Sequence, residues 1–213
     1  MKNKRLIHFF FKILPLIVSA VFHPLIMPTL GTYIILNSDV SVPLLDESSK
    51  NVVLTVVILC TFCLPLLFIL LLNYKKLIQL NFLSEREDRI FPYIITGLLF
   101  YINFYLLRRM GVPFIIQLFS LTSVIAVIIT LLVNMFWKIS AHMTGIGGIT
   151  AMVMILAQFF FVDVAVYMIS AIVISGIIGF SRLSLNEHTP AQVYTGFLGG
   201  LVITYLSFLF LVI

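Results

Sequence analysis

Long apolar runs separated by short polar segments are the dominant pattern along the chain. Seven such runs cover, to within a few residues, about 13–36, 51–73, 91–107, 113–136, 143–161, 164–180 and 190–213. A helix needs roughly 20 apolar residues to span a bilayer. Because the runs are continuously apolar and do not alternate, they are not the strands of a transmembrane β-barrel. The pattern predicts an all-α fold, a polytopic transmembrane helix bundle.

The first apolar run differs from the other six because it contains Pro24 and Pro28. Proline removes a backbone donor and breaks or kinks a helix at the preceding turn. We therefore expect a kinked or re-entrant first segment. A bundle of seven spans and a bundle of six, with this segment only partly inserted, both remain open.

The composition agrees with a membrane protein and excludes several other classes. Of the 213 residues, 62% are hydrophobic and only 10% are charged, whereas soluble domains have about 25% charged residues. Too little polar surface is available for a cytosolic enzyme, a secreted disulfide scaffold or a disordered chain. We expect a single transmembrane domain over residues 1–213, embedded among membrane lipids. An integral protein of the bacterial inner (cytoplasmic) membrane fits this composition.

The basic residues indicate an orientation for the chain. The formal net charge is +5, but the Lys and Arg residues lie at the ends of apolar runs, which does not indicate a nucleic-acid partner. Lys and Arg are enriched near the N-terminus and in the loop 74–90, which predicts that both are cytoplasmic. Arg108 and Arg109 fall on the opposite side and oppose this assignment. The loop 74–90 itself predicts an interfacial amphipathic helix.

Three polar clusters stand at the borders of apolar runs, where polar groups merit a functional interpretation. They are residues 86–92, which open the third run, residues 138–142, which open the fifth, and residues 181–192, between the sixth and the seventh. Two crossings separate each cluster from the next. An even number of crossings returns the chain to the same membrane face, so we expect all three clusters at one interface.

The residue types in these clusters point to phosphate chemistry. Helix N-termini with free N–H groups favour anions, and the arginine guanidinium offers a planar fork of donors to phosphate oxygens. Histidine serves as a nucleophile or as a general acid near neutral pH. The combination predicts a phosphate-ester site at the boundary between lipid and water.

The spacing of the third cluster resembles the last motif of the type 2 phosphatidic acid phosphatase superfamily, S-R-x5-H-x3-D. Here Ser181 and Arg182 are followed after five residues by His188, and the last position is Gln192. The second cluster is similar to the P-S-G-H motif of the family through the sequence 140–142. The first motif, K-x6-R-P, is matched only by the order of Arg86, Arg89 and Pro92. The resemblance covers a phosphatase-like core of about residues 85–200.

The resemblance implies a hydrolase that acts on a lipid or polyprenyl phosphate through a phosphohistidine intermediate. By position, His188 would attack phosphorus and His142 would protonate the leaving alcohol. The residues expected to hold the phosphate, or to replace the cations of the first motif, are Arg182, Ser140, Ser181, Arg86, Arg89 and Lys138. The superfamily uses no metal or other cofactor, and the sequence contains no cluster of metal ligands.

Gln192 departs from the family at the position that orients the nucleophilic histidine. The usual aspartate there stabilises the positive charge that develops on the ring, and glutamine brings no charge. The sequence therefore leaves open a weakened phosphatase and an inactive relative that binds anionic lipid head groups. A small transporter is a third hypothesis. The middles of the apolar runs carry no charged residues, which opposes an ion or proton relay.

Overall fold

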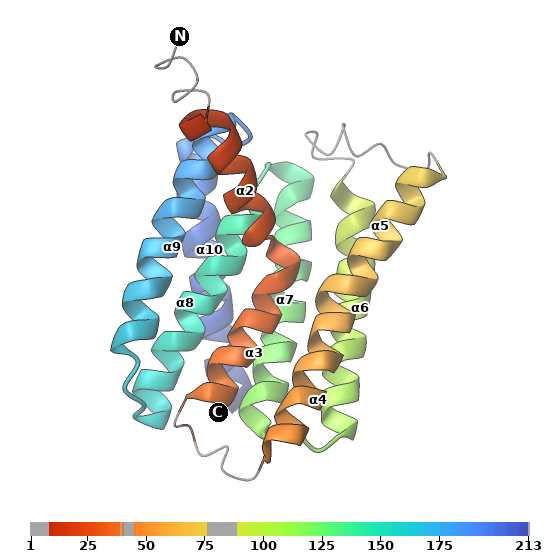
Figure 1. Cartoon of the computed structure of the whole chain (residues 1–213), viewed down its shortest axis with the longest axis vertical. Coiled ribbons are helices and arrows are strands. Elements are labelled where there is room, and N and C mark those ends of the chain that lie inside the picture. The colour runs from red at the N-terminus through yellow and green to blue at the C-terminus, as the bar shows by residue number, and fades with distance from the viewer. Residues whose placement is uncertain (1–8, 39, 41–44, 76–88, 213) are drawn as a thin grey trace.

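The computed structural model describes residues 9–38, 40, 45–75 and 89–212, and these form the all-α bundle that the sequence predicts (Figure 1). The α-helices are α2 (Leu14–Val21), α3 (Met27–Asn37), α4 (Glu47–Ile58), α5 (Leu64–Tyr74), α6 (Ile90–Arg109), α7 (Phe114–Phe136), α8 (Ala141–Phe160), α9 (Ala165–Ser184) and α10 (Pro190–Val212). Two π-helical turns, η1 (Phe9–Ile13) and η3 (Leu59–Cys63), and one 3-10 turn, η2 (Pro24–Ile26), complete the elements.

Seven segments of the described chain are long and apolar enough to cross a membrane, so the chain is an integral membrane protein. They are Phe9–Asn37, Glu47–Tyr74, Ile90–Arg109, Phe114–Phe136, Ala141–Phe160, Ala165–Ser184 and Pro190–Val212. The third and sixth segments, predicted as about 17 residues, are each 20 residues long. The first segment has 29 residues, which favours seven spans over six. The amphipathic helix predicted at 74–90 falls almost entirely outside the described residues.

Helix α8 forms the centre of the bundle, with α3, α7, α9 and α10 packed around it (Figure 1). Of its most apolar stretch, 61% is buried, compared with at most 44% for any other span among the described residues. The outer spans expose large apolar side chains, as expected of surfaces that face lipid. Any side chain at the start of α8 is therefore held by neighbours on several sides.

Helices α8 and α10 approach closely at glycines. A Cβ atom added to Gly147 would collide with the backbone carbonyl of Phe197, and one added to Gly200 would collide with the carbonyl of Thr144. Small residues let helix backbones approach each other in membranes, where packing replaces the hydrophobic effect as the main attraction between helices. This crossing brings the N-terminal ends of α8 and α10 side by side.

The first span is broken near its middle at the position that the prolines predict. Helix α2 ends at Val21, and His23 adopts an extended conformation with φ −62° and ψ 139°. A residue that precedes proline is pushed away from the helical region by the pyrrolidine ring, and Pro24 follows His23. The chain then makes the turn η2 and resumes as α3, so the span is kinked and still crosses the bundle (Figure 1).

The up-and-down order of the spans gives the bundle two distinct ends. Helix α5 ends, and helices α6, α8 and α10 begin, at the same end as the start of the first span (Figure 1). Among the described residues, that end holds most of the basic side chains, namely Lys12, Lys75, Arg89, Lys138 and Arg182. The opposite end holds Lys50, Arg108 and Arg109.

The helix crossing gives a first testable prediction. Gly200→Ala should destabilise the protein by about 1–3 kcal/mol, because the added methyl group overpacks the contact with the backbone of Thr144. Gly199→Ala is the matched control. The only neighbour of its added Cβ is the end of the Ile139 side chain at 3.9 Å, and alanine is the better helix former. Thermal unfolding in detergent should show a lower Tm for Gly200→Ala alone. Equal Tm values for the two variants would contradict the close crossing.

The charge distribution gives a second prediction, which concerns orientation. In a background with Cys60→Ala and Cys63→Ser, a single cysteine is introduced by Glu187→Cys at one end or by Asp163→Cys at the other. An impermeant maleimide added to intact cells should label Asp163→Cys and leave Glu187→Cys unlabelled until the membrane is permeabilised, because Lys and Arg accumulate on the cytoplasmic side. The reverse labelling pattern would invert the orientation.

Candidate functional site

The connection between α9 and α10 brings an arginine and a histidine together. Helix α9 ends in a Schellman motif in which Asn186 is left-handed, with φ 53°, and the Glu187 N–H donates to the Arg182 carbonyl at 3.3 Å. This turn folds the chain back, and the Glu187 carboxylate lies 3.7 Å from the Arg182 guanidinium. His188 follows and is buried at 7% exposure. The five-residue spacing between Arg182 and His188 thus corresponds to a helix end and a tight turn.

Helix α10 begins with a capping box formed by Thr189 and Gln192. The Thr189 hydroxyl accepts the Gln192 N–H at 3.4 Å, and Gln192 Oε1 accepts the Thr189 N–H at 3.1 Å. These two bonds satisfy backbone donors that the first turn of a helix leaves free. They also fix the orientation of the Gln192 amide, because rotating it would direct its NH₂ group toward the Thr189 N–H.

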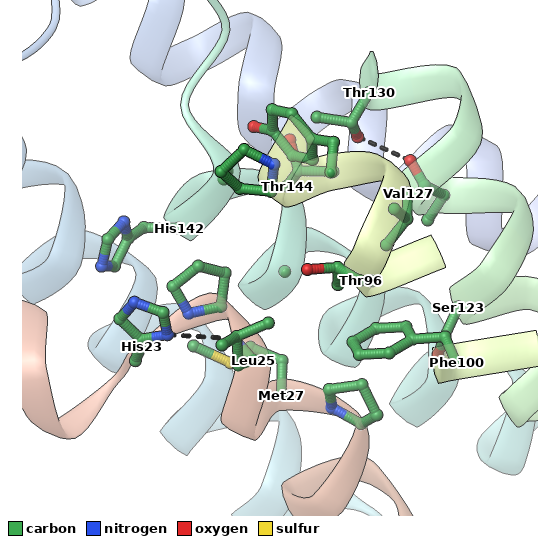
Figure 2. Close-up of a pocket in the computed structure, with 18 of the residues that line it drawn as sticks. His23, Leu25, Met27, Thr96, Phe100, Ser123, Val127, Thr130, His142 and Thr144 are labelled. Atoms are coloured by element: carbon green, nitrogen blue, oxygen red, sulfur yellow. Dashed lines mark hydrogen bonds between the residues drawn. The ribbon is translucent and has the colours of Figure 1, made fainter. Parts of the chain in front are cut away.

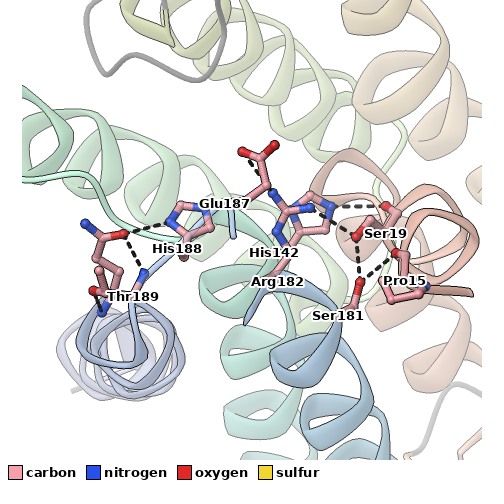
Figure 3. A network of polar contacts seen from close by, with 9 residues as sticks. Pro15, Ser19, His142, Ser181, Arg182, Glu187, His188 and Thr189 are labelled. Carbon is pink, nitrogen blue, oxygen red and sulfur yellow. Dashed lines mark hydrogen bonds and ion pairs between the residues drawn. The ribbon is translucent and has the colours of Figure 1, made fainter. Parts of the chain in front are cut away.

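The oriented amide determines which nitrogen of His188 carries the proton. Gln192 Oε1 lies 3.2 Å from His188 Nδ1 (Figure 3). An amide oxygen only accepts hydrogen bonds, so Nδ1 carries the proton and Nε2 of the neutral ring keeps its lone pair. Gln192 therefore orients His188 in the tautomer that a nucleophile attacking through Nε2 requires, although it supplies no charge.

The surroundings of His188 keep its ring neutral. Burial, together with the positive charges of Arg89, Arg182 and, less strongly, Lys138, lowers the pKa of His188 from 6.5 to about 3, against an opposing effect of the hydrogen bond with Gln192. Burial and like charge both disfavour the protonated form. At neutral pH the nucleophilic form of His188 is therefore available without prior loss of a proton.

The break in the first span supplies a hydrogen-bond acceptor for His142. In an unbroken helix the N–H of residue 23 would bond to the carbonyl of Ser19, but His23 is extended and leaves that carbonyl free. The Ser19 carbonyl instead faces His142 Nε2 at 3.0 Å. Because a carbonyl only accepts, Nε2 of His142 carries the proton and Nδ1 keeps a lone pair.

Arg182 is anchored to the first span by a chain of hydroxyl groups (Figure 3). Its Nη1 donates to Ser19 Oγ at 3.0 Å, and Ser19 Oγ and Ser181 Oγ are 2.9 Å apart. The Ser181 hydroxyl donates to the Pro15 carbonyl at 2.6 Å, so the hydroxyl of Ser19 donates to Ser181. The chain holds the guanidinium in one orientation and occupies the Ser181 hydroxyl.

Two buried polar groups at this end lack a hydrogen-bond partner within the described residues. Ser140 is fully buried and precedes α8 without capping it through its side chain. Among the described residues, neither Ser140 Oγ nor Arg182 Nε has a hydrogen-bond partner. Buried polar groups of this kind are costly unless a partner satisfies them. They lie beside the first turn of α8, whose free N–H groups favour an anion.

A cavity of about 530 Å³ connects this polar end with the apolar interior of the bundle (Figure 2). Its charged and imidazole side chains are those of His23, Arg89, His142, Arg182, Glu187 and His188. Hydroxyl groups also line it, those of Tyr93, Thr96, Ser123, Thr130, Thr144 and Thr204. Farther inside, its apolar walls include Met27, Ile69, Phe100, Phe119, Val127 and Ile149. The volume lies within the range of small-molecule sites. One cavity therefore offers cations and histidines at the interface and an apolar chamber behind them.

The structure brings most of the candidate residues named from the sequence to this site. His142, His188, Arg182 and Arg89 line the cavity. Lys138 is half-buried and close enough to His188 to affect its pKa. Ser140, Ser181 and Gln192 stand behind the lining, where Ser181 holds the first span and Gln192 holds His188. Arg86 lies outside the described residues.

Two residues of the first span were missed as members of the site. His23 lines the cavity, with its ring centroid 5.7 Å from that of His142 (Figure 2), and Ser19 contacts both His142 and Arg182. No role in the site was assigned to His23 from the sequence. A polar imidazole ring inside an apolar run is energetically costly. This cost is the feature of the sequence that could have marked His23 as a functional residue. Nothing local distinguishes Ser19, because its partners are 123 and 163 residues away.

The charges of the site suit an anion. Among the described residues, Arg89 and Arg182 line the cavity together with one carboxylate, that of Glu187, which is paired with Arg182. In the described part of the chain, no group of three or more His, Cys, Asp or Glu side chains is arranged to hold a metal ion. The donors available to a ligand are guanidinium, imidazole and backbone N–H groups.

Comparisons of the chain with protein-family models, with curated proteins and with solved structures found no match. The function is therefore inferred from the geometry and chemistry of the site itself.

The hydrogen bond between Gln192 and His188 gives a third prediction. In protein labelled with ¹⁵N-histidine, His188 should show the Nδ1–H tautomer, and its ring should stay neutral down to about pH 5, because its pKa is about 3. Assignment uses the spectrum of His188→Ala. Gln192→Leu should mix the two tautomers of His188. A wild-type His188 that titrates near pH 6.5 would contradict the buried geometry.

Proposed function

We propose that this protein is a membrane-embedded phosphohydrolase for a lipid or polyprenyl phosphate, with His188 as the nucleophile. The single observation that carries the proposal is the pairing of His188 with Gln192, which leaves Nε2 unprotonated in a cavity lined by cations. A structural histidine at a helix end has no need of a fixed tautomer, a neutral ring and neighbouring arginines. A nucleophile that attacks an anionic phosphate group uses all three.

The residues of the cavity account for each step of the proposed reaction. Arg182 and the first turn of α8, which both line the cavity, hold the non-bridging oxygens. As the ester binds, its monoanionic phosphate group gives a proton to the free Nδ1 of His142. His188 Nε2 then attacks phosphorus, the bond from phosphorus to the ester oxygen breaks, and the leaving oxygen takes that proton from His142. Water then attacks the phosphohistidine, gives a proton to His142 and releases phosphate, which restores the neutral Nε2 of His188.

The shape of the cavity supports a lipid substrate. Its polar end lies at the border of the spans, and its apolar walls continue between α3, α6, α7 and α8. A phosphate group at His188 would therefore leave an attached hydrocarbon chain next to Phe100, Phe119 and Val127. We propose a location in the bacterial cytoplasmic membrane with the cavity open to the cytoplasm, because Lys and Arg accumulate at that end.

An inactive relative that binds anionic lipid head groups is the second candidate. The observation in its favour is Gln192 itself, which orients His188 but adds no negative charge to stabilise the positive charge formed on attack. Removing the corresponding charge from a serine-protease triad costs roughly 10⁴-fold in rate. The two candidates share the same anion site and differ in whether a phosphohistidine forms.

A hydrolysis assay tests the proposal and gives a fourth prediction. The purified protein should release inorganic phosphate from lipid monophosphates or diphosphates presented in detergent micelles. His188→Ala should reduce the rate by at least about 10³-fold, because the nucleophile is lost. Thr195→Ala, one turn farther along α10 on its exposed surface, is the matched control and should retain the wild-type rate. Substrate with ³²P should label wild-type protein with an acid-labile phosphate that is absent from His188→Ala.

The variant Gln192→Glu separates the two candidates in the same assay. It preserves the length of the side chain and the capping box, and it adds the missing charge beside His188 Nδ1. A weak enzyme should become faster by about 10- to 10³-fold, and the gain should vanish when His188→Ala is added. The opposite outcome is that wild type and Gln192→Glu both bind lipid head groups but neither hydrolyses them nor forms a phosphohistidine. That outcome would support the hypothesis of a binding protein and refute that of a phosphatase.

A further inference from the structure

A carboxylate lies among the cations of the cavity and has no part in the reaction described above. It belongs to Glu187, whose Oε2 is 3.7 Å from Nη2 of Arg182 (Figure 3). Among the described residues, Glu187 is the one acidic side chain that lines the cavity, together with the basic side chains of Arg89 and Arg182. A negative charge repels an anionic ligand, so the presence of this carboxylate in an anion site requires an explanation.

The turn between α9 and α10 does not depend on the side chain of Glu187. Backbone hydrogen bonds of 3.0 to 3.3 Å close this turn, donated by the N–H groups of Leu185, Asn186 and Glu187. The side chain of Glu187 is 39% exposed, and exposed ion pairs contribute little to the free energy of unfolding. A role in stabilising the fold therefore does not account for the carboxylate.

The guanidinium of Arg182 has one strong contact and one weak contact. Its Nη1 donates to the hydroxyl of Ser19 at 3.0 Å, and Ser19 is buried. The distance of 3.7 Å between Nη2 and the Glu187 carboxylate is longer than that of a hydrogen bond. An anion that enters the cavity can therefore displace the carboxylate of Glu187 while Ser19 keeps the guanidinium in place.

Glu187 acts on Arg182 and not on the nucleophile. The ring of His188 is directed at Gln192, whereas the carboxylate of Glu187 is directed at Arg182 (Figure 3). The charges of the described residues that shift the pKa of His188 are all positive. Glu187 thus does not replace the charge that Gln192 lacks. Its carboxylate instead occupies the position beside Arg182 that an oxygen of the ligand would take.

We propose that Glu187 determines which charge state of the ligand is bound, because its carboxylate competes with the ligand for Arg182 and repels a second negative charge. This inference rests on the proposed function, since it requires the phosphate group to bind at Arg182. The Coulomb energy is proportional to the charge of the ligand. Glu187 therefore opposes a doubly charged phosphate group about twice as strongly, in free energy, as a singly charged one.

This selection by charge suits the proposed reaction. The singly charged ester carries the proton that it gives to His142 on binding. A doubly charged ester brings no proton, and His142 would then have none for the leaving oxygen. Glu187 therefore favours the form of the substrate that the reaction uses. It also weakens the contact of Arg182 with the phosphate that is produced, which favours release of the product.

The test measures the binding of two anions that differ in charge. Sulfate carries two negative charges and methyl sulfate carries one, and neither changes its charge near neutral pH. Each anion is titrated into ¹⁵N-histidine-labelled protein in detergent, and its Kd is obtained from the shift of the Nε2 resonance of His188. In Glu187→Gln, methyl sulfate should bind about 3-fold more tightly than in wild type, and sulfate about 10-fold more tightly. The second change is about the square of the first because the repulsion is proportional to the charge.

Two further variants separate the charge of Glu187 from its other properties. Glu187→Asp keeps the charge and should bind both anions within about 3-fold of the wild-type Kd. Asp163→Asn removes a carboxylate from the connection between α8 and α9, at the opposite end of the bundle, and should leave both Kd values unchanged. Weaker binding of sulfate by Glu187→Gln would show that the carboxylate orients Arg182 for its ligand, and would overturn the inference. Equal changes for the two anions would also overturn it.

The same experiment distinguishes failure of this inference from failure of the proposed function. Wild-type protein that binds both anions at His188 but hydrolyses no lipid phosphate would refute the phosphohydrolase, and selection by Glu187 would then apply to a binding site. A His188 resonance that neither anion shifts in wild type would overturn both, because it would show that no anion binds there.

Discussion

The close approach of α8 and α10 is the contact on which the site depends. In lipid, two apolar helices gain little by excluding water, so they associate where their backbones can come into contact. Gly147 and Gly200 provide that contact, and Gly196 brings α10 against the backbone of Ser140. The crossing sets the first turn of α8 against Gly196 and Gly200 of α10, so that both helices begin at the same end of the bundle. As a result, His142 and His188, which are 46 positions apart in the sequence, line one cavity.

Long-range hydrogen bonds from the first span complete this arrangement. The first span is attached through the carbonyls and hydroxyls of its broken helix, not through an apolar face alone. Because the break frees the carbonyl of Ser19, a proline in the sequence determines which nitrogen of His142 is protonated. The tautomer of His188 is determined independently, by the capping box of α10. The two histidines thus present opposite ring nitrogens to the cavity, Nδ1 from His142 and Nε2 from His188.

Much of this architecture could be predicted from the sequence, because the bilayer restricts the choice of structure. Apolar runs of sufficient length must be spans, and the even number of crossings determines that residues 89, 142 and 188 share one end. The prolines marked the position of the kink. The roles of Ser19 and His23 were not predictable, because they depend on side-chain contacts across more than 100 residues. The orientation of Gln192 also required the structure, since the capping box that fixes its amide involves Thr189, which has no distinctive place in the motif.

The connection of Ser19 with Arg182 and His142 has a consequence for the biosynthesis of the protein. Chains are synthesised and inserted from the N-terminus, so the broken first helix enters the bilayer long before α8 and α9 exist. Throughout that interval the carbonyl and hydroxyl of Ser19 have none of their later partners, and such groups are costly in hydrocarbon. Insertion of α9, the sixth of the seven spans, is the step that completes their hydrogen bonds. If synthesis stops before α9, the first span therefore keeps polar groups without hydrogen-bond partners, and these groups are exposed to the quality-control machinery of the membrane.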